Sequence, residues 1–369
     1  MIICVNLEPK SKDDLDRLVA LGGYRDYSEA VAVAISNQLL LHTVESSTSF
    51  QVTSLPPLIR EASSKPTESE LERQTSALVP TLFGAITEDH SAVKIAQATH
   101  DQSSSGNGTS LDKWIWGQHN KLLPVKAACR ALAHLLTREL ASYEGVSLSK
   151  ASSEIAFEAV KLGDHLRLKE REFGLLRDET LAHGFPRRDA ENEDKSRLRF
   201  ATQFVGSTDS QGNLTGLPAD LKLIGIESPR GTRILLTEAG WRFAAMENPI
   251  LDAPSTRPAR KFTEEEVGFL FDHIMEQVPC ESFAFRTVVK LIDGGACTPE
   301  LLDQALRDYL PDRNENPFSP AFLTTQRAGV ISRLSDLGLL QRVRDGIKVR
   351  YAMTDDGQKY FQTVMHRTA

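Results

Sequence analysis

The fold of the chain is decided by two similar stretches of sequence, LKLIGIESPRGTRILLTEAG at residues 221–240 and LGLLQRVRDGIKVRYAMTDDG at residues 337–357, the second longer by one residue. Each begins with apolar residues typical of a helix end and continues as strand, turn and strand. Thr237 in the first copy and Thr354 in the second are then followed by an acidic residue, which indicates an N-cap and a new helix. This recurrence indicates a weak internal duplication.

Helical patterns lie upstream of both stretches. Before the second, Thr263 and Glu266 form a capping-box pattern, and an apolar helix face follows, made of Val267, Leu270, Phe271 and Ile274. Before the first, Pro124 opens one apolar helical pattern, and a longer pattern runs over residues 149–171. The chain is therefore expected to be mainly α with small β elements, and residues 111–255 and 256–369 are expected to form two domains.

Residues 1–45 show the pattern of a strand followed by two helices. Gly22-Gly23 ends the first helix, and the residues expected in the apolar core are Ile3, Val5 and Leu7 of the strand and Val31 and Ile35 of the second helix. A unit of this size rarely buries a sufficient core alone, and oligomerisation is the usual remedy.

With Tyr27-Ser28-Glu29-Ala30 opening its second helix, this unit resembles the ribbon-helix-helix family. The resemblance implies an intertwined homodimer formed by pairing the N-terminal strands. The outward strand residues Ile2, Cys4 and Asn6 include no Lys or Arg, so we expect dimerisation rather than DNA reading. The alternative is a plain cap on the next domain. Residues 46–110 are expected to form a linker with a helix over residues 67–77, ending in the polar stretch HDQSSSGNGTS.

The two duplicated stretches resemble the close of a winged-helix domain. The resemblance rests on Leu334-x-x-Leu337-Gly338-Leu339-Leu340, a basic hairpin and Met353-Thr354-Asp355-Asp356-Gly357, and it extends to residues 221–240. It implies three helices and a β-hairpin wing, with one helix in the major groove of DNA and the wing on a phosphate backbone or in the minor groove. Winged helices also serve as protein–protein modules, so the fold alone does not decide the function.

The second hairpin is expected to have an apolar face and a cationic face. Asp345-Gly346 is a favoured two-residue turn, and alternation predicts an inward apolar face of Val343, Ile347, Val349 and Tyr351. The opposite face is then expected to carry Arg342, Arg344, Lys348 and Arg350. Four cations on one face repel each other unless an anion binds, and phosphate suits arginine geometry. The alternative is a solvated wing whose cations are free in water or paired with Asp336 and Asp355.

The helix expected over residues 323–337 is the candidate recognition helix. Burial of its apolar residues is expected to leave Gln326 and Arg333 on the flanks, where they could read adenine and guanine, respectively, or be ordinary surface residues. The corresponding cations of the first domain are Lys195, Arg197, Arg199, Arg230 and Arg233.

Several classes of protein are excluded by what the sequence lacks. The four cysteines show no metal-ligand spacing, and no phosphate-loop, dinucleotide-binding or His-Glu-x-x-His motif occurs, so neither an enzyme nor a metal or cofactor site is expected. Ser147-x-x-Lys150 is interpreted as a chance match to an acyl-enzyme motif. The absence of a signal peptide and of a long apolar run predicts a cytoplasmic protein without a membrane partner.

The net charge of −7 argues against indiscriminate coating of nucleic acid. The acidic excess is concentrated at the front, because residues 1–110 contain 8 Lys or Arg and 14 Asp or Glu. We therefore expect a dimeric protein that binds duplex DNA through winged helices, of the transcription-regulator, partition or replication-initiator type. The alternative is a non-catalytic scaffold or adaptor subunit of a larger nucleoprotein complex, whose winged helices bind protein partners.

Overall fold

The computed structural model describes residues 79–87, 93–96, 111–138, 145–176, 179–188, 190, 192–227, 232–253, 257–310, 318–346 and 348–367. The chain divides into two compact units, residues 1–65 and 66–369, and the described residues all belong to the second. The expected dimerisation module of residues 1–45, with Ile3, Val5, Leu7, Val31 and Ile35, lies outside the described residues.

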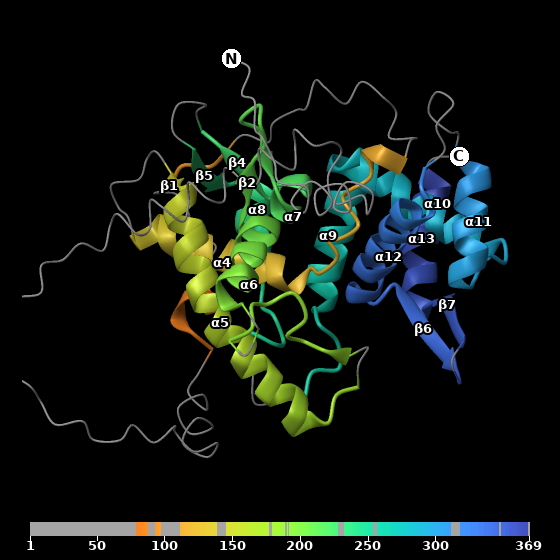
Figure 1. Cartoon of the computed structure of the whole chain (residues 1–369), viewed down its shortest axis with the longest axis horizontal. Helices are drawn as coiled ribbons and strands as arrows, with labels where there is room; N and C mark the ends of the chain where they lie inside the picture. Colours follow the sequence, from red (N-terminus) through yellow and green to blue (C-terminus); the bar gives the residue numbers. More distant parts are fainter. Residues whose placement is uncertain are drawn as a thin grey trace, which may run out of the picture. The chain divides into compact units, whose positions relative to one another are not determined.

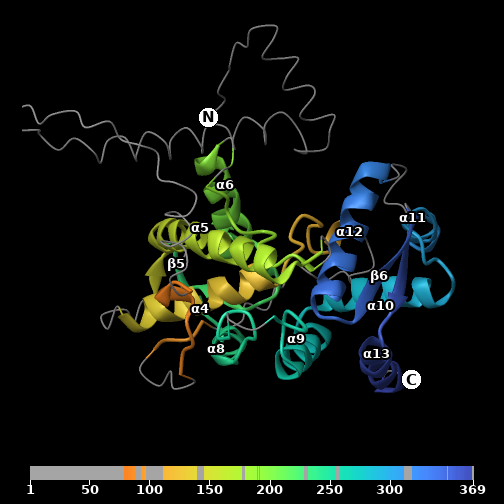
Figure 2. The same cartoon turned by 90° about the horizontal axis from the view of Figure 1, so that it is seen from below.

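The first half of the described unit is helical with short antiparallel strands (Figure 1). Its elements are η1 (Thr81–Phe83), η2 (Leu111–Lys113), α4 (Leu123–Arg138), β1 (Val146–Ser147), α5 (Leu148–Phe173), α6 (Glu193–Phe200), the π-helical turn η4 (Ala201–Val205), β2 (Ser207–Thr208), β3 (Leu214–Thr215), α7 (Leu217–Asp220), β4 (Ile224–Ile226), β5 (Arg233–Leu236) and α8 (Glu238–Ala245). Helix α4 lies between α5 and α8, as Figure 2 shows, and is buried along most of its length. The antiparallel sheet has the order β1-β5-β4.

The second half consists of helices followed by a longer hairpin. Its elements are α9 (Glu264–Gln277), α10 (Pro279–Asp293), α11 (Pro299–Tyr309), α12 (Pro320–Asp336), β6 (Leu340–Asp345), β7 (Lys348–Met353) and α13 (Asp355–Arg367). The expected capping box begins α9, because Thr263 accepts from the Glu266 amide and Glu266 accepts from the Thr263 amide. Proline occupies the first turn of α10, α11 and α12, where it needs no hydrogen-bond partner. The described residues are thus mainly helical with small sheets, and no helix among them is long and apolar enough to cross a bilayer.

The internal duplication is visible in hydrogen bonds that recur at the two helix starts. In the first copy, the Thr237 hydroxyl donates to the Lys222 carbonyl at 2.8 Å and accepts from the Gly240 amide at 3.0 Å. In the second, the Thr354 hydroxyl donates to the Gly338 carbonyl at 2.7 Å and accepts from the Gly357 amide at 3.0 Å. One threonine in each copy therefore caps a helix and fastens it to the end of the preceding helix.

The chain turns in the same way before each hairpin. Lys222 and Gly338 both have positive φ angles, 56° and 71°, and each follows a buried leucine that ends a helix. The carbonyl of the next residue, Leu223 or Leu339, then accepts from the amide of the capping threonine. Glycine adopts this conformation freely, whereas Lys222 is the only non-glycine residue of the described chain that does so.

The two halves share one hydrophobic core. Aromatic rings of the first half pack on the second, as where Phe243 lies 6.3 Å from both Phe262 and Phe269 between ring centroids. A fully buried ion pair of 2.9 Å joins Lys126 of α4 to Glu266 of α9. The expected linker over residues 46–110 also contributes, because Phe83 of η1 is fully buried in the same core. Residues 111–255 and 256–369 are therefore parts of one packed body.

We expect Gly240→Ala and Gly357→Ala to destabilise the protein to similar extents. A Cβ at Gly240 would overlap with the Leu223 carbonyl, and a Cβ at Gly357 would overlap with the Leu339 carbonyl. Each substitution should cost about 1–3 kcal/mol of unfolding free energy, measured by urea denaturation.

The matched control is Gly268→Ala, within helix α9. Only the flexible Tyr360 hydroxyl lies near the added Cβ, at 3.2 Å, and alanine favours the helix by up to about 1 kcal/mol. Equal unfolding free energies for all three variants would contradict the shared geometry.

Candidate nucleic-acid interface

Helix α12, the expected recognition helix, is buried against an irregular segment of the first half, residues 111–122. The backbones meet at Gly117 and Gly329, where a Cβ on either glycine would overlap with the other chain segment. Between them the side chain of Gln326 accepts from the Gly117 amide at 2.5 Å and donates to the Leu111 carbonyl at 3.1 Å. Gln326 is therefore a buried link between the two halves.

Arg333 is also fully buried in this contact. Its Nε and Nη2 atoms donate to the Glu281 carboxylate at 2.6 and 2.9 Å, and its Nη1 atom donates to the His119 carbonyl at 2.6 Å. Burial raises the pKa of Glu281, while the charge of Arg333 opposes this rise. All three nitrogens of the guanidinium thus donate to groups inside the protein.

The expectation that Gln326 and Arg333 lie on an exposed flank of α12 is wrong. Apolar spacing correctly located the buried residues Leu323, Val330, Ile331 and Leu334, but the helix is covered on its polar sides as well. Ser332 is buried too, whereas Thr325 and Ala328 are partly exposed. In this structure neither Gln326 nor Arg333 is accessible to a DNA base.

The hairpin β6–β7 keeps its cations exposed, but on both faces. Its register pairs Arg342 with Tyr351, Val343 with Arg350, Arg344 with Val349 and Asp345 with Lys348. Cross-strand partners share a face, so Arg342 and Arg344 lie on one face and Lys348 and Arg350 on the other. The expectation of four cations on a single face is therefore wrong. A two-residue turn pairs even-numbered with odd-numbered residues, which reverses the alternation across the turn.

The base of the hairpin is anchored and its outer part is exposed. Near the base, the buried Tyr351 donates its amide to the Cys297 carbonyl at 2.7 Å and accepts through its hydroxyl from Arg327 at 2.7 Å. Arg342, Arg344, Lys348 and Arg350 are all exposed, with Arg350 donating to the Cys297 sulfur at 3.4 Å, and Val343 is 45% exposed. Figure 1 shows the hairpin extending past the ends of the surrounding helices. A large ligand can therefore approach it from both faces.

The cationic candidates of the first half are not brought together in the same way. Lys195 and Arg199 of α6 are exposed, while Arg197 forms an ion pair with Asp194 on the same helix. Arg233 of β5 donates to the Gly145 carbonyl at 2.8 Å, which joins it to the start of β1. Arg230 lies outside the described residues. The first hairpin is thus part of a three-stranded sheet, and its described residues form no projecting cationic ribbon.

A cationic cluster that the sequence analysis missed lies where the two halves meet. Lys121 and Lys261 both pair with Asp336, at 3.5 and 2.8 Å, and the Leu122 amide donates to the same carboxylate at 3.0 Å. Burial alone would raise the pKa of Asp336, but the two lysines and these hydrogen bonds hold it below its usual value. The members come from three distant places in the chain, so local sequence patterns could not reveal the cluster.

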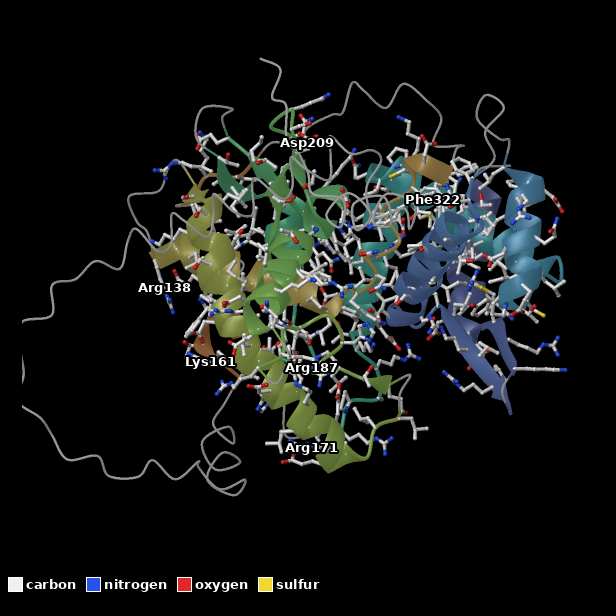
Figure 3. The ribbon with its side chains drawn as sticks, in the orientation of Figure 1. Arg138, Lys161, Arg171, Arg187, Asp209 and Phe322 are labelled. Carbon is white, nitrogen blue, oxygen red and sulfur yellow. The ribbon has the colours of Figure 1, made fainter. Side chains whose placement is uncertain are left out.

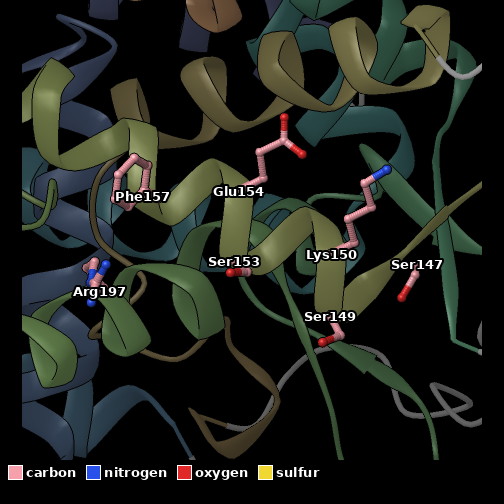
Figure 4. Close-up of a pocket in the computed structure, with 7 residues that line it drawn as sticks. All are labelled: Ser147, Ser149, Lys150, Ser153, Glu154, Phe157 and Arg197. Carbon is pink, nitrogen blue, oxygen red and sulfur yellow. The ribbon is translucent and has the colours of Figure 1, made fainter. Parts of the chain in front are cut away.

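A shallow surface hollow of about 550 Å³ lies at the start of α5. It is lined by Ser147, Ser149, Lys150, Ser153, Glu154, Phe157 and Arg197 (Figure 4). The Ser147 hydroxyl and the Lys150 amine point in different directions, so the hollow shows no nucleophile–base contact between them. Among the described residues, no three His, Cys, Asp or Glu side chains gather into a group that could hold a metal ion.

Comparison of the chain with protein-family models, with curated proteins and with solved structures gave no match.

We expect Arg333→Met to destabilise the protein by about 3–5 kcal/mol, because it leaves the buried Glu281 carboxylate without its cation. The double variant Arg333→Met with Glu281→Leu should recover part of this loss, since it removes both buried charges. Urea unfolding of the two variants and the parent protein measures the difference. A single variant within 1 kcal/mol of the parent would show that the pair is not a structural link.

Proposed function

We propose that the chain is a DNA-binding protein that contacts duplex DNA through the β6–β7 hairpin, while α12 holds the two halves together. The observation that carries this proposal is the exposed hairpin with Arg342 and Arg344 on one face and Lys348 and Arg350 on the other. Because α12 is buried, the hairpin replaces it as the contact surface.

A ribbon with cations on both faces suits a groove better than a single phosphate backbone. The major groove is about 12 Å wide and admits a two-stranded β-ribbon. Both of its walls are lined by phosphates, so each face of the hairpin would meet one anionic strand. Arginine is suited to this contact because its planar guanidinium forms paired hydrogen bonds with phosphate oxygens.

The recurring arrangement of helix end, hairpin and threonine-capped helix supports a winged-helix interpretation of both halves. Under this interpretation the wing of the second half contacts DNA, and helix α12 packs in the protein interior. We further propose that residues 1–45 form a homodimer, so that two hairpins act on one duplex. Such pairing would strengthen binding without additional contacts per chain. A cytoplasmic location and the absence of catalysis remain predictions.

The alternative function is a scaffold subunit that binds protein partners. One observation favours it: Leu301 and Tyr309, both on helix α11, are large apolar side chains that remain exposed. Exposed apolar side chains on one element can mark a protein contact. The hairpin test below separates the two proposals, because a scaffold would not depend on the hairpin cations for duplex binding.

The hairpin variants Arg342→Ala with Arg344→Ala and Lys348→Ala with Arg350→Ala should each weaken binding to duplexes of unrelated sequence about equally. Each phosphate contact contributes about −0.9 to the slope of log affinity against log salt, so each pair should flatten the slope by up to about 2. Fluorescence anisotropy over a salt series measures both quantities.

The matched control is Arg138→Ala with Lys161→Ala, which removes the same charge from exposed positions on α4 and α5, away from the hairpin (Figure 3). This control should change the slope little. Unchanged affinity and slope in both hairpin variants would reject the DNA-binding proposal and favour the scaffold.

The dimer proposal predicts that light scattering of the full chain gives twice the chain mass of 40.8 kDa. Val5→Asp should convert the protein to a monomer, because a buried unpaired carboxylate in the paired strands would be too costly. A monomeric parent protein, or a Val5→Asp variant that stays dimeric, would contradict a dimer formed by residues 1–45.

A further inference from the structure

The cluster around Asp336 carries two positive charges and one negative charge at a site that is largely shielded from solvent. Lys121 and Lys261 are only 16% and 15% exposed, and their ion pairs within the described chain are both with Asp336, which is 3% exposed. Removing two ammonium groups from water costs several kcal/mol each, and one carboxylate compensates only one of them. The pair of lysines therefore retains a positive field.

Further cations act electrostatically on this group. Burial has the largest effect on Lys121 and lowers its pKa. Asp336 opposes this effect, and the charges of Lys261 and Arg342 lower the pKa further. His183 lies beside the same group: its pKa is lowered by burial and by the charges of Lys121, Lys261 and Arg199, while Asp336 opposes them. A Cβ at Gly184 would lie 3.4 Å from the Cβ of Lys121, so the two chain segments are adjacent.

These groups come from separate elements and could enclose one anion. Lys121 precedes α4, Lys261 precedes α9, and Arg342 is an exposed residue of β6 next to the hairpin base. We infer that Lys121, Lys261 and Arg342 form a binding site for a phosphoryl oxyanion at the junction of the two halves. A phosphoryl group offers several oxygens to several cations, and each ammonium has three donors, of which one is directed to Asp336.

The site deepens the proposed function, because Arg342 belongs to both surfaces. A duplex lying on the hairpin could place a backbone phosphodiester at the junction, and the existence of the anion site does not itself depend on duplex binding. The same oxygen chemistry could instead come from a free phosphoanion. The experiment below uses one probe of each kind.

His183 provides a reporter at the site. Its imidazole signal in the full chain, labelled with ¹³C-histidine, can be assigned by its loss in His183→Gln. Pyrophosphate should raise the pKa of His183, because the anion offsets the field of the two lysines. By linkage, pyrophosphate should bind more tightly below the pKa of His183 and more weakly as the pH rises through it.

Lys121→Met should weaken pyrophosphate binding on the order of tenfold, the effect of losing a charge-assisted hydrogen bond. It leaves the Lys261–Asp336 pair and the Leu122 amide contact in place, and a thermal melt checks the fold. Lys161→Met, an exposed lysine on α5, is the matched control and should bind as the parent protein does. A His183 pKa that does not respond to pyrophosphate, or an equal response in Lys121→Met, would overturn the inference.

A short duplex of random sequence distinguishes the two sources of the anion. If the duplex raises the His183 pKa as pyrophosphate does, the site holds a backbone phosphate; if only pyrophosphate acts, it holds a free phosphoanion. Lys348→Ala with Arg350→Ala, which retains Arg342, separates this inference from the proposed function. Unchanged duplex affinity in that variant and in Arg342→Ala with Arg344→Ala would reject hairpin binding, whereas the pyrophosphate result alone decides the anion site.

Discussion

The packing of α12 against residues 111–122 is the contact on which the rest of the described structure depends. An irregular segment in the interior must find partners for its backbone groups, because an unpaired buried N–H or carbonyl is costly. Here Gln326 pairs with the Gly117 amide and Arg333 with the His119 carbonyl. Backbone groups of the segment and buried side chains of α12 are therefore each other's hydrogen-bond partners. Removing either partner leaves the other unpaired in the core.

This mutual dependence limits which surface is available for the DNA binding that we propose. A helix whose polar side chains complete the protein interior cannot also present them to a major groove. Arg333 illustrates the conflict, since its guanidinium donates to both Glu281 and His119. The hairpin is held to the helices at its base by Tyr351, and its cations are exposed. The proposed binding surfaces therefore lie on β6–β7 and at the adjoining junction.

Local sequence patterns predicted most of the helices and both threonine caps, because these depend on residues three or four positions apart. The capping box at Thr263 and the apolar face around Leu270 are of this kind. The same reasoning failed for Gln326, since hydrophobic periodicity assigns polar residues to solvent and cannot recognise a second protein surface across the helix.

The two site errors also have physical causes. The faces of the hairpin depend on how the register continues through the turn, and counting in steps of two across that turn placed Lys348 and Arg350 on the wrong side. The junction cluster depends on tertiary packing that joins Lys121, Lys261 and Asp336, which are far apart in the sequence. The register follows from the length of the turn and could have been counted correctly, whereas this packing is not contained in a short sequence window.

The two copies of the duplicated stretch differ in what protects their strand edges. In the first, β1 extends the sheet on one side, and residues 234–236 of β5 are buried. In the second, the described strands β6 and β7 form a sheet of their own with exposed side chains. Charged side chains on such edges also prevent aggregation, but charges of either sign would have that effect. Acidic residues outnumber basic ones in the chain by 50 to 43, yet the hairpin carries four cations and one acid, Asp345. The sign, opposite to that of the whole chain, favours a role in binding an anionic partner.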